Sequence, residues 1–321
     1  MHDEYDSRTI TQLRSKKNKV DPYIPYHFLH EEEPGLSGNI ETINTIFLTS
    51  KECAFKCLMC DLWKNTLDEP APPGAIVKQI NYALERLPKA DAIKLYNNGN
   101  FFDTKAISPK EYPAIINRVA NYKRVIVENH PKLCNKYCIE FNEMLDGKLE
   151  VAMGLETIHP DVLPRLNKQL TPEDFKKATN FLNKHDIDVR AFILLNAPYI
   201  TNPKESISWT LQSIQFAFEC GVVRCSVIPV RPGNGVMDIL WKENYYTPPT
   251  LAMLEEVSEK ALLLNRAQVF VDTWDIGFLS GCSTCFDARK NRLEKMNLTQ
   301  KILPTINCGC HTNYDCFIKR L

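Results

Sequence analysis

The feature that most constrains the fold is a repeated alternation of short apolar runs with longer amphipathic segments. The apolar runs are bounded by polar, Pro or Gly residues, which is typical of strands buried on both faces. They cover residues 42–50, 92–98, 124–129, 149–156, 188–196 and 222–230. Helical patterns lie between them at 74–87, 171–185 and 204–221, and the second begins with Thr171 as an N-cap before Pro172. This rhythm predicts a parallel sheet with right-handed crossovers, either open and doubly wound or curved into a barrel.

Length and charge narrow the class of protein. The chain has 321 residues, 44% of them hydrophobic, which is enough for one large core or two smaller ones. Its 39 basic and 39 acidic residues balance, so overall charge gives no reason to expect nucleic acid or an anionic membrane as a partner. The first 20 residues are polar and no apolar run is long enough to span a bilayer, so we expect a cytoplasmic protein without a membrane partner. In that compartment the 12 cysteines indicate metal ligands or buried thiols rather than disulfides.

Three cysteines follow directly after the first predicted strand. The stretch "KECAFKCLMC" places Cys53, Cys57 and Cys60 in the loop that leaves this strand. Active sites collect at the carboxyl ends of parallel strands, both in barrels and in open sheets. Three thiolates fall one short of a closed tetrahedral site, and soft thiolates select zinc, copper(I) or iron–sulfur clusters. A zinc knuckle and a set of packed thiols are the alternatives at this point.

The Cys-x3-Cys-x2-Cys spacing after the first strand resembles the signature of the radical S-adenosylmethionine superfamily. The resemblance implies a partial (β/α)6 TIM-like barrel with a cysteine-rich C-terminal extension. It also implies that the triad is the catalytic centre and holds a [4Fe–4S] cluster whose open iron binds S-adenosylmethionine. Such enzymes, of the lyase or oxidoreductase class, take an electron from a donor such as ferredoxin or flavodoxin. They cleave the cofactor to a 5′-deoxyadenosyl radical, which would here abstract hydrogen from a small molecule or a modified base.

The resemblance also indicates which strand ends would bind the cofactor. The superfamily carries a Gly-Gly-Glu-like edge after the second strand, and "LYNNGNF" stands there, so the acid is absent. Carboxylates at the ends of the third and fourth strands could bond the ribose hydroxyls or the ammonium group of the cofactor, and a guanidinium opens the fifth strand. Of these, the carboxylate in the "GLET" turn resembles the family most. The expected cofactor-binding residues are Asn97, Asn98, Gly99, Glu128, Glu156 and Arg190.

A closer resemblance runs from about residue 45 to residue 312. The strings "KLYNNGNFFD", "VIVENHP", "VAMGLET", "VRAFILLNAPYIT", "LWKENYYTPP", "CSTC", "MNLTQ" and "CGC" are similar, in that order, to the radical-subunit family of archaeosine synthase, which is related to the elongator-type radical enzymes. This resemblance implies cleavage of the carbon–nitrogen bond of a lysine adduct on a deazaguanine base in tRNA. Because the charge of the chain is balanced, we expect weak tRNA binding by the isolated chain, and a small molecule or a base presented by a partner protein as the substrate.

The C-terminal part of the sequence contains a second cysteine group. Cys282 and Cys285 form Cys-x2-Cys, Cys308 and Cys310 form Cys-x-Cys, and Cys316 follows. Four thiolates drawn from two close pairs fit a structural zinc or a second [4Fe–4S] cluster, and the spacing does not separate the two. Four basic residues behind the first pair are expected on an ordinary solvated helix. They are Arg289, Lys290, Arg292 and Lys295.

Together these patterns predict an N-terminal extension (1–40), a partial barrel (41–250) and a cysteine-rich extension packed on the barrel (251–321). Two classes of function follow. The first is a radical S-adenosylmethionine enzyme, including the archaeosine-type tRNA modification as one case. The second is a non-catalytic metal-thiolate module that binds tRNA or a partner enzyme.

Overall fold

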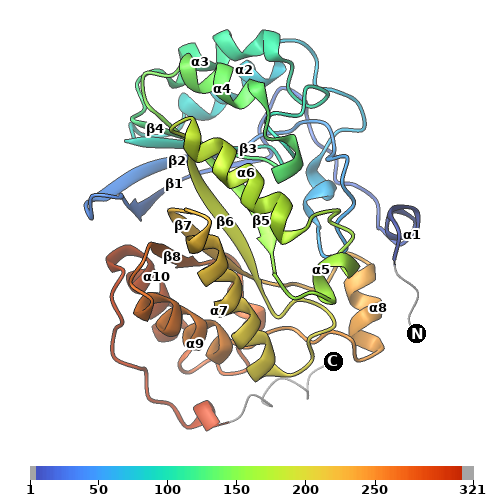
Figure 1. The fold of residues 1–321 in the computed structure, drawn as a ribbon, viewed down its shortest axis with the longest axis vertical. Helices are drawn as coiled ribbons and strands as arrows, with labels where there is room; N and C mark the ends of the chain where they lie inside the picture. Colours follow the sequence, from blue (N-terminus) through green and yellow to red (C-terminus); the bar gives the residue numbers. More distant parts are fainter. Residues whose placement is uncertain (1–4, 313–321) are drawn as a thin grey trace.

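One curved sheet organises the molecule. In the computed structural model, which describes residues 5–312, eight strands follow one another in sequence order (Figure 1). β1 pairs antiparallel with β2, and every later neighbour is parallel. The strands are β1 His27–Pro34, β2 Ile40–Phe47, β3 Ala92–Tyr96, β4 Arg124–Glu128, β5 Lys148–Glu156, β6 Asp188–Leu195, β7 Arg224–Pro229 and β8 Gln268–Val271.

The six strands predicted from the sequence are β2 to β7, and the partial TIM-like barrel is confirmed. β1 and β8 extend the sheet by one strand at each edge. Neither has the continuous apolar run of a central strand, because β1 is half-exposed and rich in glutamate and β8 has only 4 residues. The flanking segments 1–40 and 251–321 therefore each contribute an edge strand.

Helices cover the outer face of the sheet and the carboxyl ends of its strands. They are α1 Ser7–Gln12, α2 Ala75–Leu84, α3 Tyr112–Val119, α4 Lys136–Glu143, α5 Val162–Arg165, α6 Pro172–Lys184, α7 Pro203–Glu219, α8 Val236–Lys242, α9 Leu251–Leu263 and α10 Phe286–Thr299. Short 3-10 turns cover Leu62–Asn65, Pro109–Glu111, Pro131–Leu133, Ile276–Leu279 and Gly309–Thr312. The three predicted helices are confirmed as α2, α6 and α7. Thr171 caps α6 in a capping box with Asp174, as the sequence pattern indicates.

Successive residues of each strand point alternately to the apolar core and to the concave, inner side of the sheet. Leu95, Val127 and Ile193 belong to the large apolar core between the sheet and the outer helices. Because successive side chains of a strand point to opposite faces, their neighbours Tyr96 and Phe192 point into the concave side of the sheet. The concave side is therefore lined by a different set of residues, which includes charged and aromatic side chains and a small apolar cluster of Ile43, Ala92 and Ile126.

A second, smaller core lies at the carboxyl ends of the strands. It joins Ile10 of α1, Leu163 of α5 and Val236 of α8 to Leu58, which lies inside the cysteine loop. In Figure 1 these three helices lie together at the right of the view, away from the layer of outer helices. Burial of Leu58 therefore fixes one point of the loop that carries the cysteine triad. No helix in residues 5–312 combines the length and apolar character needed to cross a membrane.

Candidate cofactor and metal sites

The cysteine triad lies in the loop after β2, at the carboxyl end of the parallel strands. Cys57 is buried and Cys53 and Cys60 are half-buried. Burial raises the pKa of the Cys57 thiol to about 11 and also raises the pKa of the Cys53 and Cys60 thiols. The three thiols are therefore protonated at neutral pH unless a metal centre supplies the positive charge that stabilises thiolates.

Two side chains from distant segments and one from the turn that follows hold the backbone of this loop. Asn167 Nδ2 donates to the Lys56 carbonyl at 2.7 Å, and Asn234 Nδ2 donates to the Leu58 carbonyl at 2.7 Å. Trp63 Nε1 donates to the Cys60 carbonyl at 3.1 Å. Each bond satisfies a carbonyl that no strand or helix ladder reaches. The loop is thus held in one shape without help from regular secondary structure.

A network of neutral groups ties the loop to the ends of β3 and β4. Asn100 Nδ2 donates to Cys53 Sγ at 3.1 Å, and its Oδ1 accepts from the His130 backbone N–H at 2.6 Å. The His130 ring stacks on Phe55 of the cysteine loop with the ring centroids 3.7 Å apart. Burial lowers the pKa of His130 to about 3, so this imidazole is neutral. The contacts that Asn100 and His130 make with the loop are therefore packed and uncharged.

Glu128 provides the carboxylate that the sequence lacks after β3. Its Oε1 accepts from the backbone N–H groups of Asn97 at 2.7 Å and Gly99 at 3.3 Å. Burial raises the pKa of Glu128 to about 7, although the N–H groups of Asn97 and Gly99 act to lower it. The acid of β4 thus lies against the "NNG" turn, where the resemblance led us to expect only amides and carbonyls.

Glu156 forms a buried ion pair with Lys168. Lys168 Nζ lies 2.7 Å from Glu156 Oε1, and less than a tenth of each side chain is exposed. Glu156 has a positive φ of 68° at an irregularity in the β5–β6 pairing, and such strain is stored mainly at functional sites. A Cβ at Gly154 would lie 2.6 Å from Lys168 Nζ, so only glycine leaves room for the pair. No sequence pattern marks Lys168, which lies 12 residues beyond Glu156 in an irregular loop.

Three buried amide atoms near these strand ends have no hydrogen-bond partner among the described residues. They are Asn97 Oδ1, Asn98 Nδ2 and Asn196 Oδ1. Asn98 and Asn196 also have positive φ values of 54° and 61°; Asn98 is the second residue after β3, and Asn196 follows β6 directly. An unpaired buried polar atom costs free energy, so these amides are suited to binding a polar ligand. They lie at the edge of the sheet where the cysteine loop begins.

Arg190 does not lie with the other predicted cofactor residues. It is near the start of β6, whereas the cysteine loop is at the opposite, carboxyl end of the strands. Its guanidinium is already paired, with Nη2 at 2.7 Å from Glu33 Oε2 and Nε at 2.7 Å from Glu150 Oε1. These residues belong to a buried ionic layer that also includes Lys94, Arg124 and Arg224. Arg190 therefore closes the amino-terminal end of the barrel, and we exclude it from the cofactor site.

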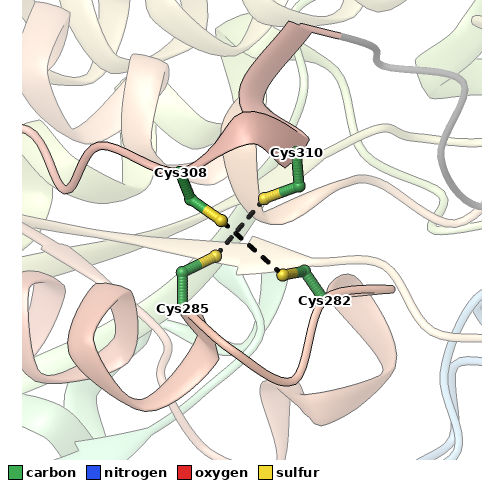
Figure 2. Close-up of side chains that lie close together, drawn as sticks. All are labelled: Cys282, Cys285, Cys308 and Cys310. Carbon is green, nitrogen blue, oxygen red and sulfur yellow. Dashed lines mark hydrogen bonds between the residues drawn. The ribbon is translucent and has the colours of Figure 1, made fainter.

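The C-terminal cysteines converge on one point. Figure 2 shows the side chains of Cys282 and Cys285, before α10, facing those of Cys308 and Cys310. Their sulfur atoms all lie within 4.8 Å of one another, with 3.8 Å between Cys282 and Cys308 and 3.4 Å between Cys285 and Cys310. Four sulfurs bound at about 2.3 Å around one tetrahedral zinc lie about 3.8 Å apart. A [4Fe–4S] cluster binds each thiolate through a different iron and needs a wider spacing, so this group fits a single ion.

The first triad is built differently. Among residues 5–312, the C-terminal group is the set of cysteines compact enough for one ion, and Cys53, Cys57 and Cys60 form no such set. Wider spacing is what a cluster with a separate iron for each thiolate requires. The donor set of three thiolates also fits a cluster with one iron left open. Cys316 lies outside the described residues.

The prediction of a solvated basic helix is wrong for two of its four residues. Arg289 and Arg292 of α10 are buried and pair with Glu255 of α9, where Arg289 Nε lies 2.9 Å from Glu255 Oε2. The spacing of the basic residues along the sequence did not show that Glu255 of α9 would lie buried opposite Arg289 and Arg292. The pairs fix α10 against the barrel, and Cys285 is the residue that precedes its first turn.

Two curated relatives resemble most of the chain. An uncharacterized protein of Methanocaldococcus jannaschii is 26% identical over 336 residues, which covers 97% of this chain and 92% of that protein. Archaeosine synthase subunit beta of Methanosarcina acetivorans is 24% identical over 286 residues, covering 83% of this chain and 82% of that protein. No protein-family model matches the chain.

Among solved structures, that of methylornithine synthase has a TM-score of 0.53 at 11% identity, covering 83% of this chain and 75% of that chain. This match agrees with the partial TIM-like barrel that the sequence predicts. The similarity to archaeosine synthase subunit beta agrees with the string order seen in the sequence.

Proposed function

We propose that this protein is a radical S-adenosylmethionine enzyme. The observation that carries the proposal is the cysteine loop itself, in which three thiols at the carboxyl end of the strands are held by Asn167, Asn234 and Trp63. A zinc knuckle would need a compact set of ligands, and the triad is not compact. Packed thiols alone would not require the two anchors from distant segments, Asn167 and Asn234.

In this proposal Cys53, Cys57 and Cys60 hold a [4Fe–4S] cluster and the strand ends bind the cofactor. The bound cluster would supply the electron that cleaves S-adenosylmethionine to methionine and a 5′-deoxyadenosyl radical. Glu128 and the Asn97–Gly99 turn are suited to accept bonds from the ammonium group of the cofactor. The Glu156–Lys168 pair offers an acceptor for ribose hydroxyls and a cation for the carboxylate.

The other parts of the proposal concern the second metal site and the substrate. Cys282, Cys285, Cys308 and Cys310 are proposed to bind one structural zinc ion, because their spacing matches that of a single tetrahedral ion. The substrate is proposed to be a small molecule or a modified base. Archaeosine-type cleavage of a lysine adduct is the specific case that the similarity to archaeosine synthase subunit beta favours.

Anaerobic reconstitution tests the proposal. The reconstituted protein should be brown, bind iron and sulfide, and form 5′-deoxyadenosine when it is reduced with S-adenosylmethionine. Cys57→Ala should lose the cluster and cofactor cleavage while the barrel stays folded, and Cys220→Ala, which alters a buried thiol outside both groups, should keep them. Colourless, zinc-loaded protein that cannot cleave the cofactor would support the metal-thiolate module instead. Cofactor cleavage by Cys57→Ala would also overturn the assignment.

A further inference from the structure

The side chain of Asn100 lies directly against one sulfur of the cysteine triad. Its Nδ2 donates to Cys53 Sγ at 3.1 Å, a bond between residues 47 positions apart in the sequence. Asn100 is in the loop after β3 and Cys53 is in the loop after β2. Because β2 and β3 pair in parallel, these two loops lie at the same end of the sheet. The contact is therefore a product of the tertiary structure and not of the cysteine motif.

A backbone group fixes the orientation of the Asn100 amide. Its Oδ1 accepts from the His130 backbone N–H at 2.6 Å. A backbone N–H can only donate, so the amide atom that faces it must be the oxygen. The NH2 group must then face Cys53, because a flipped amide would set its own NH2 against the N–H of His130.

The segment that carries Asn100 is also rigid. The Asn100 carbonyl accepts from the Asp103 N–H at 3.2 Å, and the Phe101 N–H donates to the Glu128 carbonyl at 2.9 Å. Phe101 is fully buried in the large core, where its ring centroid lies 5.1 Å from that of Phe141. A donor held in this way is already in place when negative charge develops on the sulfur, so no reorganisation is needed.

This bond differs in kind from the bonds that anchor the loop. Asn167 and Asn234 donate to carbonyl groups of the loop backbone, whereas Asn100 donates to a side-chain sulfur. A neutral thiol is a weak acceptor, so the bond adds little to the stability of the metal-free loop. It becomes stronger when the sulfur carries negative charge, as a thiolate does. Asn100 is therefore placed to act on the charged form of Cys53.

Burial increases the effect of this donor. Asn100 is 2% exposed, so water does not compete for its amide. In such surroundings a hydrogen bond to a charged group is screened less than it is in water. The loop itself supplies the other donors to the triad, since the Phe55 N–H bonds Cys53 and the Leu62 N–H bonds Cys60. Asn100 adds to these a donor from another loop.

We propose that Asn100 raises the reduction potential of the cluster bound by the triad, and that it acts through Cys53. This inference rests on the proposed function, because the cluster is the one proposed there. Reduction adds one electron from an external donor, no bond forms or breaks, and part of the added charge lies on the sulfur ligands. Hydrogen bonds to these sulfurs are among the factors that set the potential. An N–H donor stabilises the more negative, reduced form more than the oxidised form, so the cluster accepts an electron at a less negative potential.

A redox titration followed by electron paramagnetic resonance tests this role, with dithionite as the reductant and without S-adenosylmethionine. Asn100→Ala removes the donor, and Asn100→Asp replaces it with a negatively charged oxygen while keeping the acceptor for the His130 N–H. At the midpoint potential of the wild type, the ratio of reduced to oxidised cluster should fall about three- to tenfold in Asn100→Ala, where tenfold corresponds to about 59 mV for one electron. The fall should be larger in Asn100→Asp.

The order of the two variants separates this role from a purely structural one. If Asn100 only shaped the loop, Asn100→Asp, which keeps the size of the side chain and its bond to His130, should resemble the wild type more than Asn100→Ala does. Asn167→Ala is the matched control, because it removes an amide that bonds the Lys56 carbonyl. It should lower the iron content per chain without changing the potential of the clusters that form.

Three results would show that Asn100 does not set the potential. They are an unchanged potential in Asn100→Ala, an equal shift in Asn167→Ala, and failure of both Asn100 variants to bind iron. Cofactor cleavage by the wild type would leave the proposed function standing in each of these cases. If the wild type binds no iron–sulfur cluster, the proposed function fails, and the role of Asn100 fails with it.

Discussion

At the scale of single residues, the Glu156–Lys168 pair is the polar contact on which cofactor affinity should depend most. A charge-assisted hydrogen bond contributes about 1.5–3 kcal/mol, and Gln keeps the shape of Glu but not its charge. We expect Glu156→Gln to weaken S-adenosylmethionine binding by about ten- to a hundredfold in an equilibrium titration. Iron content should not change. Glu85→Gln, at the exposed end of α2, is the matched control, and an unaltered affinity in Glu156→Gln would show that this carboxylate does not contact the cofactor.

Glu128 should make stability depend on pH. Its pKa is raised to about 7 in the folded protein, so the folded state holds a proton that the unfolded chain has already lost. The free energy of unfolding should therefore fall as the pH rises from about 4.5 to about 7 and stay level above it. Between about pH 5 and about pH 8, we expect the melting temperature of the wild type to fall relative to that of Glu128→Gln.

Added S-adenosylmethionine should remove this difference, because a nearby ammonium group favours the charged carboxylate. If the melting temperatures of the wild type and Glu128→Gln change in parallel across this pH range, the pKa of Glu128 is not raised in the folded protein.

At the scale of elements, the turn before α8 connects the C-terminal half of the barrel to the cysteine loop. Asn234 Nδ2 donates to the carbonyls of Leu58 and Cys60, and its Oδ1 accepts from the Met237 N–H at the start of α8. Asn234→Ala leaves the two loop carbonyls without this donor, at a cost of about 1–3 kcal/mol. We expect less iron per chain after reconstitution. Asn202→Ala removes the cap of α7 without touching the loop, and it should load iron normally. Equal loading of the two variants would mean that Asn234 does not shape the loop.

The C-terminal metal site should behave as a structural element of its own. Cys282→Ser removes one of four converging thiolates, so we expect loss of about one zinc per chain, measured by elemental analysis. The segment after α10 should then be cut faster by proteases, while cofactor cleavage at the first cluster continues. Cys220→Ser, outside both cysteine groups, should retain its zinc. Retention of zinc by Cys282→Ser would contradict the assignment of a single zinc ion to this site. The brown colour of an iron–sulfur cluster bound at this site would contradict it as well.

At the scale of the whole molecule, the distribution of charge argues against strong tRNA binding by this chain alone. Basic and acidic residues are equal in number, and two of the four arginines and lysines of α10 are buried against Glu255. Each phosphate contact needs a cation that is free to release counterions. We expect weak tRNA binding with a shallow salt dependence in filter-binding assays between about 50 and about 200 mM salt. Submicromolar binding with a steep salt dependence would instead favour an archaeosine-type reaction on intact tRNA without a partner.

The sequence by itself determined the elements and the kinds of metal ligand. Six strands and three helices follow from periodicity and capping, because these depend on residues close together along the chain. The spacing of Cys53, Cys57 and Cys60 after the first strand indicated a metal-thiolate loop, for which the family resemblance implied a cluster, and two close cysteine pairs indicated a second site.

Only the tertiary structure decided which distant groups meet. It brought Glu128 to the turn after β3, placed Lys168 against Glu156 and moved Arg190 into the ionic layer at the opposite end of the barrel. It also joined Asn234 to Cys60 across 174 residues and drew four cysteines to the spacing of a single ion. The physical reason is that these contacts depend on strand order, on strand direction and on which face of the sheet each side chain occupies. Local sequence patterns do not encode pairings between such distant residues.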